Sequence, residues 1–289
     1  MIPRWLIWTL VALVCWGIWA VIPKWIGDTL TARQSQALST VGALPVMLGL
    51  LFSKKLGGGG PAVRGSVLAF AAGALACGGN IPFYALLNSE KAATVVPLTS
   101  LYPLVTVLLA VPLLKERLNR IQIAGVIFSF VAIYLFNVSD EGGFFTRWLL
   151  VALAPVVFWG VAGMLQKIST NSISGELSTL WFLAATIPVA VFLFIQEPLT
   201  DRLSAKTWAL VTLLGLTSAL GNYAILDAFA SGGKASIIAP LAGLYPMISI
   251  PIAIVYFREQ ITPRQALGIV IALAAVAAIS VESKAEKQA

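Results

Sequence analysis

Long apolar segments alternate with short polar connections along the whole chain. Each apolar segment has roughly the 20 residues that an α-helix needs to cross the hydrocarbon core of a bilayer. The connections hold glycine, proline and charged residues, which favour turns. The pattern therefore predicts an all-α polytopic membrane protein with ten transmembrane helices, at about residues 5–22, 34–52, 67–87, 92–114, 121–138, 148–166, 179–195, 208–229, 235–257 and 265–281.

One of these segments occurs twice. Residues 234–259 read KASIIAPLAGLYPMISIPIAIVYFRE, and residues 91–116, at a shift of 143 positions, read KAATVVPLTSLYPLVTVLLAVPLLKE, with nine identities in 26. About two or three identities are expected by chance in so apolar a composition. The chain is therefore interpreted as a duplication, with one five-helix repeat in residues 1–142 and another in residues 143–289.

The number of helices in each repeat has a consequence for orientation. If two copies of five helices fold alike, the second must enter the membrane from the opposite side, which predicts inverted repeats with a wet midplane cavity between them. With the amino terminus inside, the first repeat places seven Lys and Arg residues inside and three outside. This bias predicts that both termini face the cytoplasm. The expected location is the cytoplasmic (inner) membrane.

Composition excludes several classes of protein. Of all residues, 59% are hydrophobic and 11% charged, and the mean hydropathy is +0.91, whereas about 25% charged residues is usual for soluble proteins. The net charge of +7 predicts no nucleic-acid partner, because the Lys and Arg residues lie at the ends of apolar runs, where they anchor helices in the bilayer. The chain has no histidine, which argues against Ser/His catalysis and His-based zinc sites.

The two cysteines and the scattered acids add no catalytic chemistry. Cys15 and Cys77 each lie alone in an apolar run, so packed thiols are expected rather than a disulfide or a metal site. A membrane-embedded enzyme acting on a lipid usually needs clustered carboxylates or a nucleophile with its base. The sequence therefore predicts no catalytic residue, no metal and no cofactor.

The repeated proline-interrupted helix is followed each time by an acidic turn and a last helix that bears a glycine, at residues 114–116 with Gly125 and at residues 257–259 with Gly268. This duplicated pattern resembles the EamA group of the drug/metabolite transporter superfamily. The resemblance implies a carrier in which helices 1, 3, 4, 6, 8 and 9 enclose a central cavity and helices 5 and 10 pack to the side. Members similar to this chain export amino acids and other metabolites, while relatives move sugars, nucleotide sugars or sugar phosphates.

Polar side chains inside the predicted helices are candidates for the cavity wall, since each needs a partner or a wet environment. Asn80, Tyr84 and Asn88 are spaced i, i+4, i+8, and the corresponding part of the second repeat holds Asn222, Tyr223 and Asp227, of which Tyr223 and Asp227 are spaced i, i+4. The first set and the Tyr223/Asp227 pair each fall on one helical face, which favours a shared water-filled pocket. The alternative is that these amides and phenols join helices by hydrogen bonds.

Aromatic residues are also paired by the repeat. Tyr102 and Tyr245 each precede a proline in mid-helix, and each proline is expected to free the carbonyl four residues before it. Trp16 and Trp159 are twins as well, and they either stack on a substrate or fill space between helices. The predicted substrate-binding residues are Trp16, Asn80, Tyr84, Tyr102, Trp159, Asn222, Tyr223 and Tyr245.

Charged residues near the helix ends are candidates for coupling or gating. Asp227 is the acid nearest to the membrane interior, and Lys234, the twin of Lys91, follows seven residues later and is a candidate partner for it. A buried Asp227 can carry a proton linked to transport, although helix-end charges also reach the interface without such a role. Glu116 and Glu259 are expected to cap neighbouring helices or to pair with basic residues.

These features together predict a secondary transporter of a small polar metabolite, such as an amino acid, that works by alternating access. No Walker motif is present, so a gradient or exchange drives it; the resemblance favours export. The alternatives are a sugar or nucleotide-sugar carrier of the same superfamily, a lipid-modifying membrane enzyme and a channel. The expected partners are the substrate and the lipid bilayer. Small-residue faces at Gly125/Ser129 and Gly268/Ala272 serve either packing or dimerisation, so a monomer or a homodimer is expected.

Overall fold

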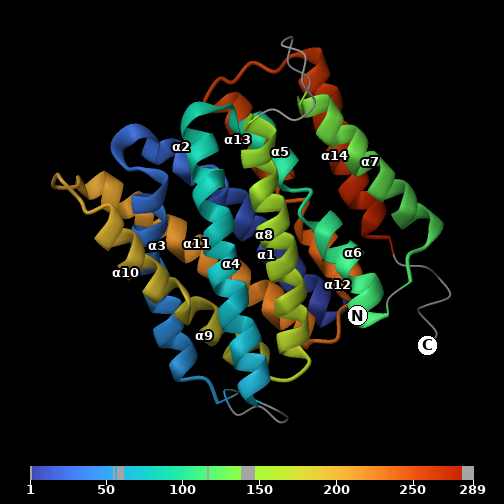
Figure 1. Ribbon diagram of the computed structural model, residues 1–289, viewed down its shortest axis with the longest axis horizontal. Coiled ribbons are helices and arrows are strands. Elements are labelled where there is room, and N and C mark those ends of the chain that lie inside the picture. The colour runs from blue at the N-terminus through green and yellow to red at the C-terminus, as the bar shows by residue number, and fades with distance from the viewer. Residues whose placement is uncertain (1, 55, 57–61, 116, 138–146, 282–289) are drawn as a thin grey trace.

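The computed structural model describes residues 2–54, 56, 62–115, 117–137 and 147–281. Within these residues the chain is helical and has no strand. The elements, shown in Figure 1, are α1 (Arg4–Trp19), α2 (Ile22–Ile26), the 3₁₀ helix η1 (Gly27–Thr29), α3 (Ala32–Leu51), α4 (Ala62–Ser89), α5 (Ala92–Thr99), α6 (Pro103–Leu114), α7 (Arg120–Asn137), α8 (Arg147–Thr170), α9 (Gly175–Ala184), α10 (Thr186–Gln196), α11 (Ala205–Ala230), α12 (Ala235–Ala242), α13 (Pro246–Val255) and α14 (Pro263–Ile279).

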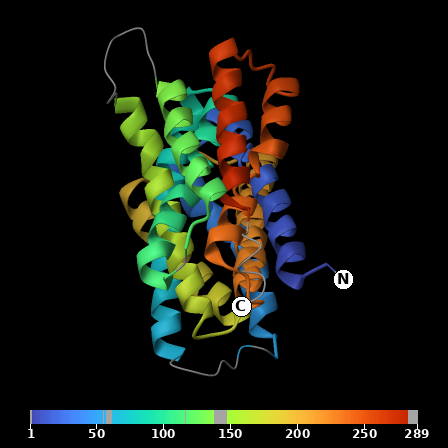
Figure 2. The same ribbon diagram turned by 90° about the vertical axis from the view of Figure 1, so that its right-hand side faces the viewer.

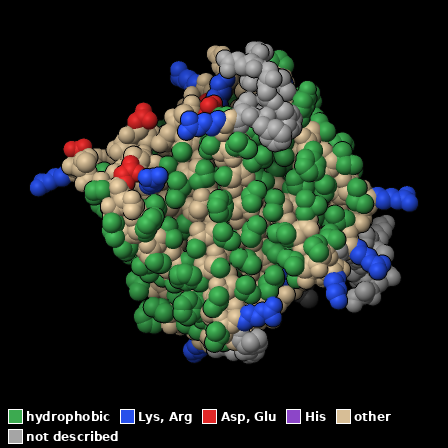
Figure 3. Space-filling view, in the orientation of Figure 1, with side chains coloured by type: hydrophobic (Ala, Val, Ile, Leu, Met, Phe, Trp, Pro, Cys, Tyr) green, Lys and Arg blue, Asp and Glu red, His purple; other side chains and the backbone are tan. Residues whose placement is uncertain are grey.

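The prediction of an all-helical membrane protein is confirmed, and helix occupies each of the ten predicted segments. Seven stretches of the described chain are long and apolar enough to cross a membrane, while α7 and α14 are apolar but shorter. Figure 3 shows a broad apolar surface with charged side chains gathered towards its edges. This distribution suits a protein whose middle faces lipid and whose ends face water.

Three predicted helices are divided in two, namely α5/α6, α9/α10 and α12/α13, whereas the first, expected at residues 5–22, ends at Trp19 and is followed by the short helix α2. The expectation that Tyr102 and Tyr245 lie in mid-helix with free carbonyls behind them is wrong, because each tyrosine lies at a break just before α6 or α13. The Tyr102 amide donates to the Thr99 carbonyl, and the Tyr245 amide to the Ala242 carbonyl, both at 3.2 Å. The chain tightens to i→i−3 bonds there, so the tyrosine amide replaces the missing proline amide.

The two central broken helices pack against each other in a reciprocal way. α5 contacts α13, and α6 contacts α12. The breaks lie close together, because a Cβ placed on Gly243 would lie 2.8 Å from the Pro103 ring. Other contacts between the two halves also occur in related pairs. The contact of α4 with α8 corresponds to that of α11 with α1, and the contact of α3 with α11 corresponds to that of α9 with α4. Helices from the two halves of the chain therefore interlock.

The two last helices of the predicted repeats, α7 and α14, lie side by side at one edge of the molecule (Figures 1 and 2). A Cβ placed on Gly125 would lie 2.8 Å from the Ala275 carbonyl oxygen, and Gly268 faces the Phe136 ring. Ser129 and Ala272 are fully buried. The small-residue faces are therefore used for packing between α7 and α14, which decides between the two uses that the sequence left open for them.

Candidate functional site

A cavity lies among the helices and is lined from both halves of the chain. Its empty space is about 900 Å³, including the part that opens outward. Its polar and aromatic lining comprises Trp16, Trp19, Gln36, Ser39, Thr40, Cys77, Asn80, Tyr102, Trp159, Gln166, Phe182, Thr186, Ser218, Asn222, Phe229 and Tyr245.

No Lys, Arg, Asp or Glu of the described chain lines this cavity. Its polar groups are amides, hydroxyls, indoles and one thiol, all of them uncharged in their ordinary states. Six of the eight predicted binding residues are brought together here, namely Trp16, Asn80, Tyr102, Trp159, Asn222 and Tyr245.

A chain of polar contacts crosses one wall of the cavity. Gln36 Nε2 lies 3.3 Å from Cys77 Sγ, Asn80 Nδ2 donates to Gln36 Oε1 at 2.9 Å, and the Trp159 indole nitrogen donates to Asn80 Oδ1 at 3.1 Å. Gln36 is buried. The amide of Asn80 therefore fixes the orientation of the Trp159 ring and connects α3, α4 and α8.

A second amide pair lies on α8 and α11. Gln166 Nε2 donates to Asn222 Oδ1 at 3.0 Å, and Asn222 Nδ2 donates to the Ser218 carbonyl at 2.9 Å. Both side chains are at least nine-tenths buried. Because buried amides are costly without partners, this pair holds both residues at the cavity wall.

Aromatic rings surround the break at Tyr102. The Trp16 and Trp159 ring centroids lie 6.3 and 6.2 Å from the Tyr102 centroid, both in edge-to-face arrangement. Trp19 lies 5.6 Å from Trp159. Such pairs are favourable beyond the area that they bury, so the aromatic wall is partly organised by contacts among its own members.

Two predicted binding residues lie outside the cavity. Tyr84 is buried behind it, and its hydroxyl accepts a hydrogen bond from the Trp19 indole nitrogen at 3.1 Å. Tyr223 packs against Trp8, with ring centroids 5.4 Å apart, and lines a separate crevice beside Glu176. Helical spacing placed these side chains on the expected faces, but neighbouring tryptophans cover them.

Part of the wall comes from residues that were not predicted from the sequence. α3 contributes Gln36, Ser39 and Thr40, and the split seventh segment contributes Phe182 and Thr186. The expectation that helices 1, 3, 4, 6, 8 and 9 enclose the cavity was therefore incomplete. The spacing of the three polar residues on α3, i, i+3, i+4, was a usable signal, because it places them on one face of the helix.

The partner of Asp227 is Arg4, whose Nη2 lies 3.0 Å from Asp227 Oδ2. The candidate pairing with Lys234 is wrong, because α1 packs along α11 and brings Arg4 to Asp227, whereas Lys234 lies at the N-cap position of α12. The Asp227 side chain is 4% exposed and that of Arg4 is 58% exposed. We call the part of the molecule around Arg4, Lys167 and Asp227 the Asp227 end.

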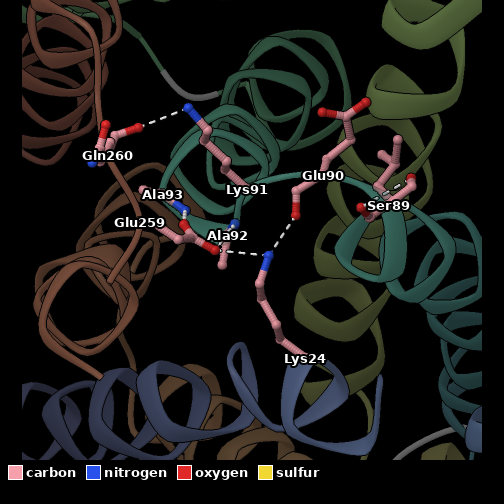
Figure 4. Close-up of polar contacts among 9 residues, drawn as sticks. Lys24, Ser89, Glu90, Lys91, Ala92, Ala93, Glu259 and Gln260 are labelled. Atoms are coloured by element: carbon pink, nitrogen blue, oxygen red, sulfur yellow. Dashed lines mark hydrogen bonds and ion pairs between the residues drawn. The ribbon is translucent and has the colours of Figure 1, made fainter. Parts of the chain in front are cut away.

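The other end carries a network around Glu259, shown in Figure 4. Its carboxylate accepts hydrogen bonds from the amides of Ala92 and Ala93, at 3.0 and 2.8 Å, and pairs with Lys24 Nζ at 2.7 Å. Lys91 Nζ donates to the Gln260 carbonyl at 2.7 Å. The expectation that Glu259 caps a helix and pairs with a basic residue is confirmed, and we call this part the Glu259 end.

One bond of this network recurs in the second half of the chain. Lys24 Nζ donates to the Glu90 carbonyl at 2.8 Å, and Lys167 Nζ donates to the Gly233 carbonyl at 2.9 Å. Both donor and acceptor are related by the shift of 143 positions. Glu116, the twin of Glu259, lies outside the described residues.

Comparisons with known proteins agree with this architecture. The EamA-like transporter family matches the chain twice, over residues 3–138 and 146–281. An uncharacterized transporter of Bacillus subtilis, YvbV, is 25% identical over 184 residues, which cover 61% of this chain and 59% of that protein. An uncharacterized transporter of Archaeoglobus fulgidus is 29% identical over 48% of this chain and 49% of its own length. A solved crystal structure shares the fold, with a TM-score of 0.68, 19% identity and 94% of each chain covered.

Proposed function

The chain belongs to the EamA-like transporter family and is a membrane transporter, and we propose that it carries a small neutral or zwitterionic metabolite, such as an amino acid, through the cavity. The observation that carries this proposal is the uncharged wall among the described residues. A phosphate group is best bound by several convergent Lys or Arg side chains. Amides, hydroxyls and indoles instead suit a solute without net charge.

We propose alternating access of two inverted five-helix repeats as the mechanism. The reciprocal packing of α5 on α13 and α6 on α12 supports it, as does the recurrence of the lysine–carbonyl bond. The first of these lysines follows the end of α1, whose 16 residues span about 24 Å from Arg4. Lys24 therefore lies at the Glu259 end, whereas Lys167 lies with Arg4 at the Asp227 end. This opposite placement of the two lysines is what two inverted copies require.

We assign the gates of this carrier to the two charged ends. At the Glu259 end, the ion pair with Lys24 and the contact of Lys91 with Gln260 join α2, α5 and the connection before α14. At the Asp227 end, the pair with Arg4 joins α1 to α11. In the orientation derived from the charge bias, the Glu259 end faces outward and both termini face the cytoplasm. The family resemblance favours export, by a monomer or a homodimer.

A stability screen followed by counterflow tests the proposed cargo. We expect neutral or zwitterionic metabolites to raise the melting temperature of the purified protein, since a ligand that binds only the folded state stabilises it. The stabilising compound should then exchange, chemically intact, across liposomes that contain the protein. If sugar phosphates are the strongest stabilisers, the cargo assignment is wrong, and if the label is chemically altered, the protein is an enzyme.

Asp227 is proposed to couple transport to protons, because its buried carboxylate pairs with an Arg4 that is half exposed. We expect Asp227→Asn to leave transport running but unresponsive to a pH gradient, since the amide carries no titratable proton. The control is Asp28→Asn, which changes an exposed acid in η1 and should leave the pH response as in the wild type. Transport by Asp227→Asn that still follows the pH gradient excludes this role.

A further inference from the structure

The aromatic residues that the repeat relates to each other differ in their hydrogen bonds. The cavity is lined by two such pairs, Trp16 with Trp159 and Tyr102 with Tyr245. One member of each pair is bonded to the protein and the other is not.

In the tryptophan pair, Trp159 is the bonded member. Its indole nitrogen donates to Asn80 Oδ1 at 3.1 Å and approaches the Ala76 carbonyl at 3.4 Å. The indole nitrogen of Trp16 packs closely against Gly221 and makes no hydrogen bond to any described residue. The cause lies in the sequence, because the position equivalent to Asn80 is Tyr223, and this tyrosine turns away to Trp8.

In the tyrosine pair, Tyr102 is the bonded member, and its hydroxyl donates to the Ala239 carbonyl at 3.4 Å. The carbonyl equivalent to that of Ala239 belongs to Val96, where the Thr99 hydroxyl already donates at 3.2 Å. The twin of Thr99 is Ala242, which has no hydroxyl, so the Ala239 carbonyl stays accessible to Tyr102. The presence of a threonine at position 99 and of an alanine at position 242 therefore accounts for the different hydrogen bonding of the two tyrosines.

As a result, the Tyr245 hydroxyl is buried without a hydrogen-bond partner in the described chain, on a side chain that is 1% exposed. The Thr99 hydroxyl lies near this phenol, and its oxygen can accept a hydrogen bond even though its proton goes to the carbonyls of Val95 and Val96. The two hydroxyls nevertheless do not meet hydrogen-bonding geometry. A buried phenol usually has a partner. Its position at the cavity wall indicates that the partner is the cargo.

We propose that the Trp16 N–H and the Tyr245 O–H are the donors that bind acceptor oxygens of the cargo, such as the carboxylate of a zwitterion, whereas Trp159 and the Tyr102 hydroxyl maintain the wall. This assignment rests on the proposed function, because it places the cargo in the same cavity. An indole nitrogen donates and does not accept, so the group that it meets must carry an acceptor. Donors without charge hold a carboxylate more weakly than Arg or Lys does, which favours its release on the other side.

The test compares the two tyrosines as a matched pair in the full-length protein. The probes are the protein amino acids and, for the amino acid that binds best, the amine that lacks its carboxylate. We expect Tyr245→Phe to weaken binding of the amino acid by about 10- to 100-fold, the range for a hydrogen bond to a charged group. The melting temperature without ligand should not fall, because the hydroxyl that is removed bonds to nothing in the protein.

Tyr102→Phe should show the opposite pattern. It loses the bond to Ala239 and keeps its ring, so we expect a lower melting temperature and a smaller loss of affinity than in Tyr245→Phe. Trp16→Phe should weaken binding of the amino acid more than Trp159→Phe does, whereas Trp159→Phe should lower the melting temperature more. The amine should bind the wild type more weakly than Tyr245→Phe binds the amino acid, because without the carboxylate the bonds to both Trp16 and Tyr245 are lost. Tyr245→Phe should not weaken amine binding further, since a shared interaction is lost only once.

Each result bears on one claim. Equal affinity losses in Tyr245→Phe and Tyr102→Phe, or an unchanged affinity in Tyr245→Phe while the wild type binds the amino acid, overturn the donor assignment and leave the transporter proposal intact. If the wild type binds no amino acid but binds phosphorylated sugars, the proposed cargo itself is wrong. If Tyr245→Phe weakens the amino acid and its amine equally, the hydroxyl contacts another part of the cargo and the acceptor assignment is overturned.

Discussion

Replacing Gly215 by alanine is expected to prevent folding of the transporter. The added Cβ would overlap the carbonyl oxygen of Ser39 and lie 3.0 Å from the Cα of Gly42. These are backbone atoms of α3, so no side-chain rotation relieves the overlap, and α3 must move away from α11. We expect a stability loss of more than about 3 kcal/mol, measured as the yield of monodisperse protein in detergent and as the melting temperature.

Gly49 supplies the matched control for this change. It also lies on α3, but a Cβ placed there meets no atom within 4 Å. Gly49→Ala should therefore keep the yield and raise stability by up to about 1 kcal/mol, the difference in helix propensity between the two residues. A wild-type yield and melting temperature for Gly215→Ala would contradict the close approach of α3 and α11.

Replacing Glu259 by alanine is expected to have the second largest effect. The side chain is 6% exposed, accepts two amide hydrogen bonds at the start of α5 and pairs with Lys24, which is 24% exposed. Removing one partner of a buried pair usually costs 3–5 kcal/mol. Because Lys24 is partly exposed, we expect about 3 kcal/mol, read from the melting temperature in detergent. Lys24→Met should cost less, about 1 kcal/mol, because the carboxylate keeps its bonds to α5.

The proposed gate is tested separately from stability with Glu259→Gln, which keeps the shape of the side chain. Cys77 lines the cavity and reports its accessibility in a Cys15→Ser background. We expect a membrane-impermeant maleimide added on the side of the Glu259 end to label Cys77 faster in Glu259→Gln than in the parent. Unchanged labelling in a protein whose melting temperature has fallen would mean that Glu259 only stabilises the fold.

The sequence predicted residue contacts well where they follow from the repeat or from helix ends. Glu259 was expected at a helix cap because it follows a spanning helix directly, and that is where it lies. The same reasoning failed for Asp227, for which the candidate partner was a neighbour in sequence. Its partner Arg4 lies 223 positions away, and only the packing of α1 along α11 brings the two together.

Helical spacing was a weaker guide to the cavity wall. It placed Tyr84 and Tyr223 on polar faces, but it carries no information about which neighbour a face meets, and Trp19 and Trp8 cover these two side chains. Gln36 lies in the wall as well, on a helix outside the repeated segments 91–116 and 234–259. A single helix face can be read from spacing, whereas the partner of that face depends on how whole helices pack.

By itself the sequence determined that this protein is a duplicated, all-helical membrane protein, and it carries the match to the EamA-like transporter family. The duplication and the helical membrane class depend on the length of the apolar segments and on identity at a constant shift, which can be found in the order of the residues alone. Only the tertiary structure decided where the spanning helices break, which small-residue faces are covered and which twin of each aromatic pair keeps a free donor. Those outcomes depend on atoms that are distant in the chain and a few ångströms apart in space, such as the Thr99 hydroxyl that occupies the Val96 carbonyl and leaves Tyr245 without a partner.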